Sequence, residues 1–211
     1  MKGMFITFEG PDGSGKTTVA KMVYHKLVKE GYDVILTREP GGIDIAEQIR
    51  DVIHNTENTA MDARTEALLY AASRRQHLVE KILPALQSGK IIICDRFIDS
   101  SLVYQGVGRG LGIEEVFMIN KFAIEDIMPD VTIMFDVSPE IGIQRINSNK
   151  DREINRLDLE AIDFHQASYH GYLQVAEMFK DRIVKIDANQ SIEEVFNQVY
   201  QIVEQRLCKN T

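Results

Sequence analysis

The sequence has few cysteines, fewer basic than acidic residues, and no long apolar run. Its two cysteines, Cys94 and Cys208, are too few for a disulfide framework or a zinc cage. The 24 lysines and arginines against 32 aspartates and glutamates give a net charge of −8, which argues against a nucleic-acid-binding surface. No apolar stretch reaches membrane-spanning length, and residues 1–4 lead into a strand pattern without a signal-peptide pattern. We therefore expect a cytoplasmic protein with neither a nucleic-acid nor a membrane partner.

Linkers, repeats and metal-binding histidine patterns are also missing. No low-complexity segment or internal repeat divides the 211 residues, and 44% of them are apolar, which is enough for the core of one domain. The five histidines show no metal-ligand spacing with carboxylates or thiols, so we assign them no chemistry. We expect a single domain over residues 1–211.

What the sequence does contain is a glycine-rich loop. Residues 10–17 read Gly-Pro-Asp-Gly-Ser-Gly-Lys-Thr and match G-x-x-x-x-G-K-[ST], whose backbone N–H groups point at phosphate oxygens. Residues 4–8 before the loop are apolar and residues 18–23 after it suit a helix, which is the context that this motif requires. We therefore predict a nucleoside triphosphate site. Its residues are Gly10, Pro11, Asp12, Gly13, Ser14, Gly15, Lys16, Thr17 and Thr18.

Two side chains of this loop and one carboxylate have expected roles. Lys16 is expected to reach the terminal phosphates, and the Thr17 hydroxyl to bind Mg²⁺. Asp95 follows four apolar residues and matches the second acidic element of phosphate-loop proteins, which holds Mg²⁺ directly or through water. Asp136 also follows an apolar run and is the competing candidate. We favour Asp95, because the adjacent Arg96 suits a phosphate.

Short apolar runs alternate with helical patterns along the whole chain. Several runs, such as residues 91–93, are apolar throughout, as is typical of parallel strands covered on both faces. The alternation predicts an α/β fold with an open, mostly parallel, five-stranded sheet flanked by helices. We expect strands at 4–9, 33–37, 90–94, 131–136 and 182–187, and helices near 16–29, 43–54, 62–87, 97–105, 113–125, 138–147, 158–179 and 191–207.

Arginines gather between the ends of the second and third expected strands. Tyr70 and Arg74 are four residues apart on an expected helix and so share a face, which suits a planar base that carries a phosphate. Taken alone, a core tyrosine and an arginine paired with a surface carboxylate explain the pair more simply. The number of arginines nevertheless favours a second anion beside the triphosphate. They are Arg38, Arg50, Arg64, Arg74, Arg75 and Arg96.

Residues 147–156 are almost wholly polar and lie between two helical patterns. An ordinary solvated loop explains such a segment. A basic lid explains it equally well, with Lys150, Arg152 and Arg156 closing over the transferring phosphates. The sequence leaves both interpretations open.

The ordered motifs of this chain resemble the bacterial thymidylate kinase family over nearly its whole length. The phosphate loop alone marks only a superfamily, whereas residues 37–42 (Thr-Arg-Glu-Pro-Gly-Gly) and 95–106 are far more specific. Further matches are residues 66–74 and 155–158. The resemblance implies a single P-loop nucleoside monophosphate kinase domain with a lid at about 146–157, acting as a homodimer. It implies the reaction of MgATP with dTMP to give ADP and dTDP.

The resemblance also implies roles around the nucleoside of dTMP. Arg74 and Gln105 would hydrogen-bond the edge of thymine, and Tyr70 would stack on its face, where many relatives have phenylalanine. Tyr104 would crowd the 2′ position of the sugar and favour deoxyribose. Glu39 would contact the sugar side.

Other roles concern the phosphates. The resemblance implies that Arg38, Arg50 and Arg96 hold the monophosphate, with Ser101 nearby. Asp12 stands where close relatives carry an acidic residue, often glutamate, that meets the sugar, and the resemblance implies that Asp12 helps to bind the substrate with a shorter side chain.

The family supplies positive charge to the transferring phosphoryl group either from the phosphate loop or from the lid. The variable positions of this loop carry no basic residue, so the chain resembles the lid type. Arg152 is the expected catalytic lid residue, acting with Lys16 and Arg96, and Lys150 and Arg145 are the alternatives.

Two rival functions share parts of this pattern. A deoxynucleoside kinase would accept thymidine and would not need so many monophosphate-binding arginines. A GTP-dependent switch would carry Asn-Lys-x-Asp, but residues 120–123 and 149–152 both lack the final aspartate. ADP formation with dTMP, with thymidine and with ATP alone separates the three.

Overall fold

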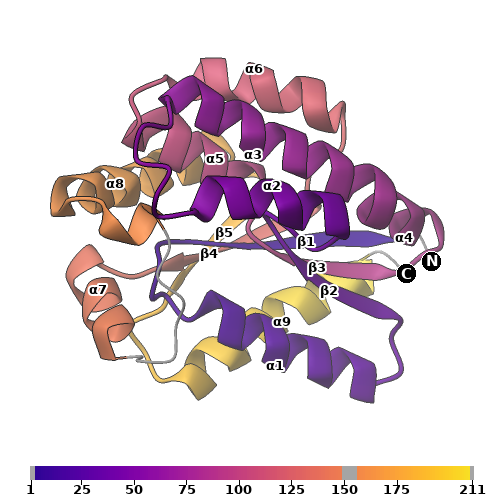
Figure 1. The fold of residues 1–211 in the computed structure, drawn as a ribbon. Helices are drawn as coiled ribbons and strands as arrows, with labels where there is room; N and C mark the ends of the chain where they lie inside the picture. Colours follow the sequence, from indigo (N-terminus) through magenta and orange to yellow (C-terminus); the bar gives the residue numbers. More distant parts are fainter. Residues whose placement is uncertain (1–2, 149–155, 210–211) are drawn as a thin grey trace.

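One parallel sheet forms the centre of the molecule (Figure 1). The computed structural model describes residues 3–148 and 156–209. The strands lie in the order β2-β3-β1-β4-β5, and every neighbouring pair is parallel. The predicted α/β fold and all its strands are confirmed. Their bounds are β1 Met4–Glu9, β2 Val34–Arg38, β3 Ile91–Asp95, β4 Val131–Asp136 and β5 Ile183–Asp187.

The expected helices are present, but two of them are interrupted by π-helical turns. The run expected at 62–87 consists of α3 Ala63–His77, π-helix η1 Leu78–Ile82 and α4 Leu83–Gln87. Its break lies just before Pro84, whose ring nitrogen has no hydrogen for the preceding turn. The run expected at 97–105 consists of α5 Ile98–Ser101 and π-helix η2 Leu102–Gly108. The others are α1 Lys16–Lys29, α2 Asp44–His54, α6 Ile113–Ile124, α7 Pro139–Ser148, 3₁₀-helix η3 Arg156–Leu159, α8 Ile162–Met178 and α9 Ile192–Lys209.

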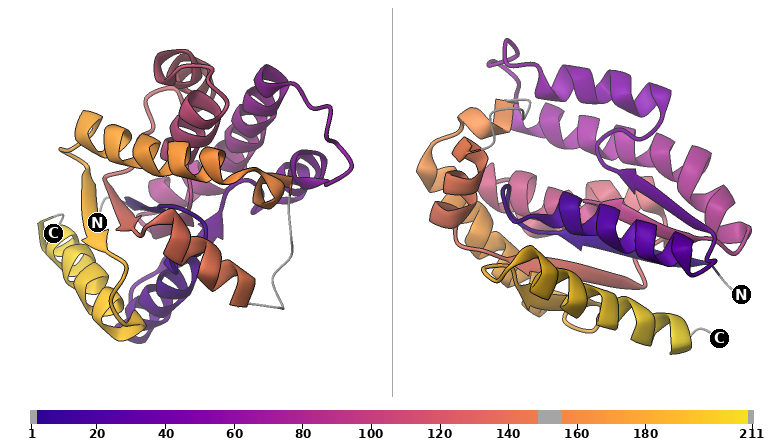
Figure 2. Two further views of the ribbon diagram at one scale, coloured as in Figure 1. Left: turned by 90° about the vertical axis from the view of Figure 1, so that its left-hand side faces the viewer. Right: turned by 90° about the horizontal axis from the view of Figure 1, so that it is seen from below.

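Helices cover both faces of the sheet and give it two apolar layers (Figures 1 and 2). On one face Ile6 and Phe8 of β1 pack with residues of α1 and α9. On the other face Phe5 packs with residues of α3, α6 and α8. Because side chains alternate along a strand, one apolar run can supply both layers. This explains why the continuous apolar runs predicted the strands so closely.

The carboxyl ends of the strands lie at one edge of the sheet, on the left of Figure 1. In open parallel sheets this edge holds the ligand site. The loops after β1, β2 and β3 meet there, and α7 and the start of α8 lie beside them (Figure 2). In the part of the chain that the structure describes, no helix is long and apolar enough to cross a membrane.

Candidate active site

The loop after β1 has the backbone conformation of a phosphate cradle. Gly10, Gly13 and Gly15 have φ angles of 142°, 77° and 87°, which side-chain-bearing residues rarely adopt. A Cβ atom on Gly13 would lie 2.2 Å from the carbonyl oxygen of Gly142, so the close approach of α7 also requires glycine there. Gly15 caps the N-terminus of α1. The partial positive charge of that helix end therefore faces the loop.

Lys16 is buried at the start of α1, with 5% of its surface exposed. Its Nζ donates to the carbonyl oxygen of Pro11 at 3.1 Å and lies 4.0 Å from Oδ1 of Asp12. Burial, with repulsion from Arg96, lowers the pKa of Lys16 to about 8, although nearby carboxylates partly offset this. A phosphate beside Lys16 would favour its charged form.

Thr17 and Asp95 meet between α1 and the end of β3. The Thr17 hydroxyl donates to the Asp95 carboxylate. Hydroxyl and carboxylate oxygens are the donors that Mg²⁺ prefers, so these residues fit that ion. Asp136 has other partners: its Oδ1 accepts from Tyr169 at 3.1 Å, and its Oδ2 lies 3.3 Å from Nζ of Lys185. Of the two candidate carboxylates, the structure brings Asp95 to Thr17.

A cavity of about 260 Å³ opens beside the phosphate loop. Most of the site residues predicted from the sequence line this one cavity. They are Asp12, Lys16, Thr17, Arg38, Glu39, Arg50, Tyr70, Arg74, Asp95, Arg96, Ser101, Tyr104 and Gln105. The other wall residues, which the sequence analysis did not assign to the site, are Pro40, His54, Phe97, Ser100 and Leu157.

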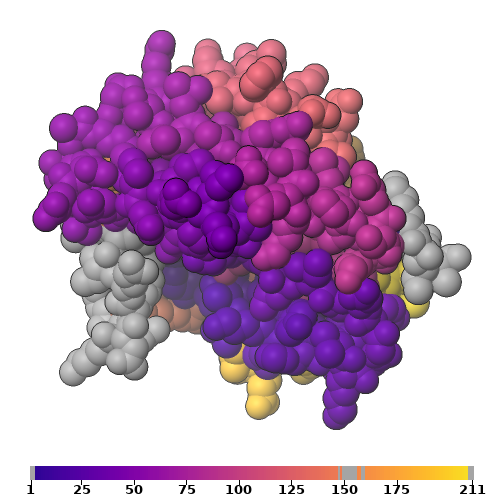
Figure 3. All heavy atoms as spheres, turned by 45° about the vertical axis from the view of Figure 1, so that its right-hand side comes forward, coloured from indigo at the N-terminus to yellow at the C-terminus, as the bar shows by residue number. Residues whose placement is uncertain are grey.

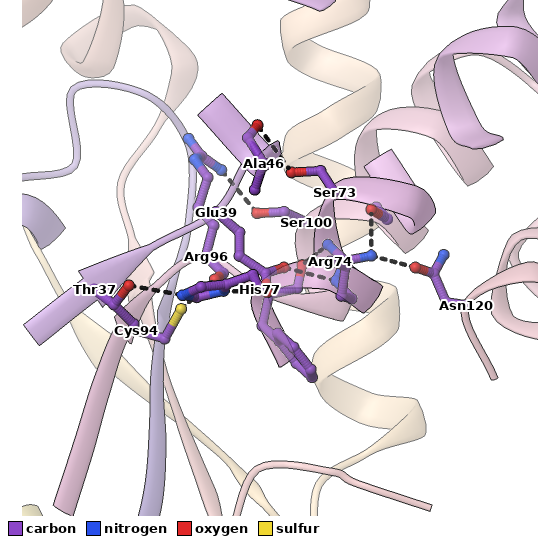
Figure 4. Close-up of polar contacts among 12 residues, drawn as sticks. Thr37, Glu39, Ala46, Ser73, Arg74, His77, Cys94, Arg96, Ser100 and Asn120 are labelled. Atoms are coloured by element: carbon purple, nitrogen blue, oxygen red, sulfur yellow. Dashed lines mark hydrogen bonds and ion pairs between the residues drawn. The ribbon is translucent and has the colours of Figure 1, made fainter. Parts of the chain in front are cut away.

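Arg74 lines the cavity and belongs to a buried hydrogen-bond network (Figure 4). Its Nε donates to Oε2 of Glu39 at 2.7 Å, and its Nη2 donates to the carbonyl oxygen of Phe97 at 2.9 Å. Its Nη1 donates to Ser101 at 3.0 Å and also to Asn120. The simpler interpretation, in which Arg74 pairs with a surface carboxylate, is wrong, because Glu39 is only 4% exposed.

Glu39 has partners on both carboxylate oxygens. Besides Arg74, it contacts Nδ1 of His77 at 2.9 Å, and Nε2 of His77 lies 2.7 Å from the Thr37 hydroxyl (Figure 4). The nearby thiol of Cys94 is buried, and burial raises its pKa well above the usual range. In this arrangement Glu39 holds Arg74, while its predicted sugar contact stays a prediction.

The arginines expected to share the monophosphate are paired with carboxylates. Nη1 of Arg38 lies 2.8 Å from Oε1 of Glu47, and Nε of Arg50 lies 3.9 Å from Oε2 of the same side chain. Nη2 of Arg96 donates to Oδ1 of Asp12 at 2.8 Å. All three arginines line the cavity, so an incoming phosphate would compete with these carboxylates for them.

Arg96 is fixed by its backbone and by buried hydroxyls. Its φ angle of 70° is unusual for a residue with a side chain and turns the chain sharply after β3. Its Nη1 donates to the hydroxyls of Ser100 and Tyr172, both at 2.9 Å. Its guanidinium also lies 5.1 Å from the centre of the Tyr104 ring. The sequence marked Arg96 and Tyr104, but it gave no signal for Tyr172.

Glu9 is a buried carboxyl that the sequence analysis missed. It ends β1 after an apolar run, as Asp95 ends β3, and this position was the available signal. Its oxygens accept from the Ser100 hydroxyl at 2.5 Å and from the Phe97 backbone at 2.7 Å. Burial and the neighbouring Asp99 raise the pKa of Glu9 to about 7, against the opposing effects of Arg96 and Ser100.

We expect Glu9 to make folding stability depend on pH. Because its pKa rises from 4.5 to about 7 on folding, its contribution is complete below pH 4.5 and is lost as the pH rises through 7. We expect urea unfolding at several pH values to show that the free energy of unfolding of the wild type falls by about 3 kcal/mol as the pH rises from below 4.5 to above 7. This fall should be missing in Glu9→Gln. The surface variant Glu177→Gln should show the same pH dependence as wild type. A Glu9→Gln variant whose free energy of unfolding still falls with pH as in wild type would contradict the raised pKa.

Of four basic residues in or near the expected lid, two lie outside the described residues and two lie within them. Lys150 and Arg152 lie outside the described residues. Arg145 of α7 donates from Nη1 to the carbonyl oxygen of Ala188 at 3.0 Å. Arg156, which the sequence grouped with the lid cations, is buried, pairs with Glu66 and donates to the carbonyl oxygen of Ile53 at 3.1 Å. Arg156 therefore serves as a buried ion-pair partner in this arrangement.

A phosphate cradle between the first strand and helix, opening into a cavity lined by arginines and aromatic residues, defines a P-loop nucleotide kinase. Comparison with known proteins gives the particular family. Residues 8–199 match the family model of thymidylate kinase, and the chain belongs to the thymidylate kinase family.

Curated relatives and solved structures agree with this membership. The chain is 60% identical over 198 residues to the thymidylate kinase of Clostridium novyi (strain NT), covering 94% of this chain and 97% of the relative. It is 59% identical over 210 residues to that of Bacillus licheniformis, covering 100% and 99%. The crystal structure of thymidylate kinase from Ehrlichia chaffeensis superposes with a TM-score of 0.77 at 33% identity, covering 97% of this chain and 99% of the other.

Proposed function

We propose that this chain transfers the γ-phosphoryl group of MgATP to dTMP, giving ADP and dTDP, in the cavity beside the phosphate loop. The activity follows from membership of the thymidylate kinase family. The observation that carries the location is that Lys16 and Asp95 line the same cavity as Tyr70, Arg74 and Gln105. Phosphoryl-transfer groups and base-binding groups thus share one space.

ADP formation tests this function directly. We expect ADP release with ATP plus dTMP, and neither with ATP plus thymidine nor with ATP alone. Rapid turnover of thymidine would identify a deoxynucleoside kinase instead. Hydrolysis with ATP alone, unaffected by dTMP, would indicate a nucleotide switch.

The proposed reaction needs positioning and charge neutralisation, and no nucleophilic side chain. A phosphate oxygen of dTMP attacks the γ-phosphorus of ATP. Lys16 and Arg96 stabilise the charge on the transferring oxygens. Thr17 and Asp95 would hold Mg²⁺, which supplies further positive charge when bound. The backbone of the phosphate loop, with Thr18 on the first turn of α1, would bind the phosphates of ATP.

The acceptor would be held along the rest of the cavity. Arg38, Arg50 and Arg96 would leave Glu47 and Asp12 to bind the monophosphate. This exchange is supported by the fact that each arginine lines the cavity and is already paired with a carboxylate. The monophosphate would replace the carboxylates of Glu47 and Asp12, so each arginine would keep an anionic partner and the electrostatic cost would be small.

The nucleoside would lie deeper in the cavity. Arg74 and Gln105 would bind the edge of thymine, with Tyr70 on its face. Ser101, whose hydroxyl accepts from Arg74, would lie nearby. Tyr104 would exclude a 2′ hydroxyl, and its packing against Arg96 supports a fixed position for the ring.

We assign the chain one P-loop nucleoside monophosphate kinase domain, with a lid at about 146–157 and Arg152 as its catalytic residue. Arg152→Ala should lower kcat far more than it raises KM for dTMP, because a lid arginine acts mainly in the transition state. Lys150→Ala is the matched control two residues away. A large KM change with kcat intact would make Arg152 a ground-state binder, and a silent Arg152→Ala with an impaired Lys150→Ala would reverse the assignment.

A second copy of this chain is the proposed partner. Large apolar side chains are exposed on α3 and α6, which pack together: Leu68 is 56%, Met118 65% and Phe122 91% exposed. The neighbouring α2 adds Val52, which is 46% exposed. Figure 3 shows segments of α2 and α6 on the same upper part of the surface. A surface of this kind is typical of an interface between protein chains.

Phe122→Glu should convert the dimer to a monomer, because it places a charge in this apolar surface. Size-exclusion chromatography with light scattering measures the mass. Val28→Glu is the matched control, since Val28 is 45% exposed on α1, which packs on the opposite face of the sheet. A monomeric wild type would contradict the proposal, as would a Phe122→Glu variant that stays dimeric.

We place the protein in the cytoplasm. Two free cysteines, Cys94 and Cys208, are compatible with a reducing compartment. Fractionation of the source cells, with detection of the protein by antibody, checks this location.

A further inference from the structure

Glu66, on the first turn of α3, is a buried carboxylate that collects three donors. Its side chain is 1% exposed. Nε2 of Gln105 donates to Oε1 at 2.8 Å, and Nη2 of Arg109 lies 3.1 Å from Oε2. Arg156 also donates to Oε2. Among the described residues, Glu66 thus links the base end of the cavity, through Gln105, to two arginines outside it.

These partners keep Glu66 ionised. Burial alone would raise its pKa, but the hydrogen bonds from Gln105, Arg109 and Arg156 and the charge of Arg109 outweigh burial, and the pKa lies below the usual value. An ionised carboxylate accepts hydrogen bonds and cannot donate them. The group that Gln105 presents to Glu66 must therefore be its NH₂.

The orientation of a planar amide follows once one branch is fixed. With the nitrogen of Gln105 on Glu66, the oxygen occupies the other branch. Gln105 lines the cavity, its side chain is 1% exposed, and no described residue donates to this oxygen. The free acceptor of Gln105 is therefore available to a molecule in the cavity.

We propose that Glu66 is a positioning residue that holds the amide of Gln105 with its oxygen toward the cavity, so that the pocket selects a base carrying a hydrogen on N3. This inference rests on the proposed function, in which Gln105 reads the base. Thymine and uracil have an N3 hydrogen and can donate to that oxygen. Cytosine has an unprotonated N3, which would face the oxygen acceptor to acceptor.

Glu66→Gln tests the proposal because it changes the orientation of Gln105 with little change of shape. The new amide can donate as well as accept, so both orientations of Gln105 become satisfied. We expect the ratio of kcat/KM for dTMP to that for dCMP to fall about tenfold. Equal losses for both substrates would mean a purely structural role and would overturn the proposal.

Glu160→Gln is the matched control. Nη2 of Arg109 lies 2.6 Å from Oε1 of Glu160, so this variant removes a carboxylate from the same arginine without altering the Glu66–Gln105 hydrogen bond. The substrate ratio of Glu160→Gln should equal that of wild type. A fall as large as in Glu66→Gln would trace the effect to Arg109 and overturn the proposal.

Two measurements make the role of Gln105 explicit. In a Gln105→Ala background, Glu66→Gln should change the ratio no further, and an additional fall would contradict action through Gln105. In a crystal structure of the wild-type protein with dTMP, N3 of thymine should lie within hydrogen-bond distance of the branch of the Gln105 amide that does not contact Glu66; N3 on the branch that contacts Glu66 would overturn the proposal without any variant. A wild type that phosphorylates no dTMP would instead refute the proposed function, and with it this inference.

Discussion

Asp95→Asn should lower turnover roughly a hundredfold or more while leaving the fold intact. The substitution keeps the shape of the side chain at the end of β3 and removes its charge. The Thr17 hydroxyl, which now donates to this carboxylate, would be left with a neutral amide. Mg²⁺ would then find the Thr17 hydroxyl and a neutral amide oxygen in place of a carboxylate, and an amide oxygen is the weaker ligand. Steady-state kinetics at saturating dTMP and increasing Mg²⁺ measure the loss.

Asp136→Asn is the matched control, because Asp136 also ends an apolar strand. Its partners are Tyr169 and Lys185, so its loss should have a much smaller effect on turnover. Thermal unfolding of both variants checks that each is folded. Near-normal turnover in Asp95→Asn together with a crippled Asp136→Asn would mean that the other carboxylate holds the metal.

The fold was predictable because its signals are local. Residues 91–93 are apolar throughout and identified β3 to within one residue, since a strand covered on both faces needs no polar side chains. The phosphate loop was equally predictable, because Gly13 and Gly15 adopt positive φ angles that few other residues adopt. The π-helical turns were not predicted, because they depend on hydrogen-bond register within a helix, which apolar periodicity does not record.

The site was predictable as a set of residues but not as a set of contacts. Arg74 and Gln105 were identified from their place in ordered motifs, and both line the cavity. Their partners Glu39 and Glu66 lie 35 and 39 residues away along the chain, so their pairing becomes visible only in the folded protein. Tyr172 was missed for the same reason, since it reaches Arg96 from a helix 76 residues later.

The network around Arg74 leads to the prediction of which base is phosphorylated. A guanidinium has five N–H donors. The described partners Glu39, Ser101, Asn120 and Phe97 accept four of them and leave one hydrogen on Nη2. This single donor suits the carbonyl oxygen at C4 of thymine, and it cannot pair with the amino group that cytosine carries there.

We therefore expect kcat/KM to fall in the order dTMP, dUMP, dCMP, with thymidine unused. Cytosine places a donor against Arg74 and an acceptor against the oxygen of Gln105, and a buried polar mismatch of this kind should reduce kcat/KM roughly a thousandfold or more. Uracil keeps the hydrogen-bonding edge and loses only the 5-methyl group, which should cost on the order of ten- to a few-hundredfold. Competition assays with purified protein and ATP give these ratios. A preference for dCMP or thymidine would show that Arg74 and Gln105 do not read the base, and the proposed function would fail with them.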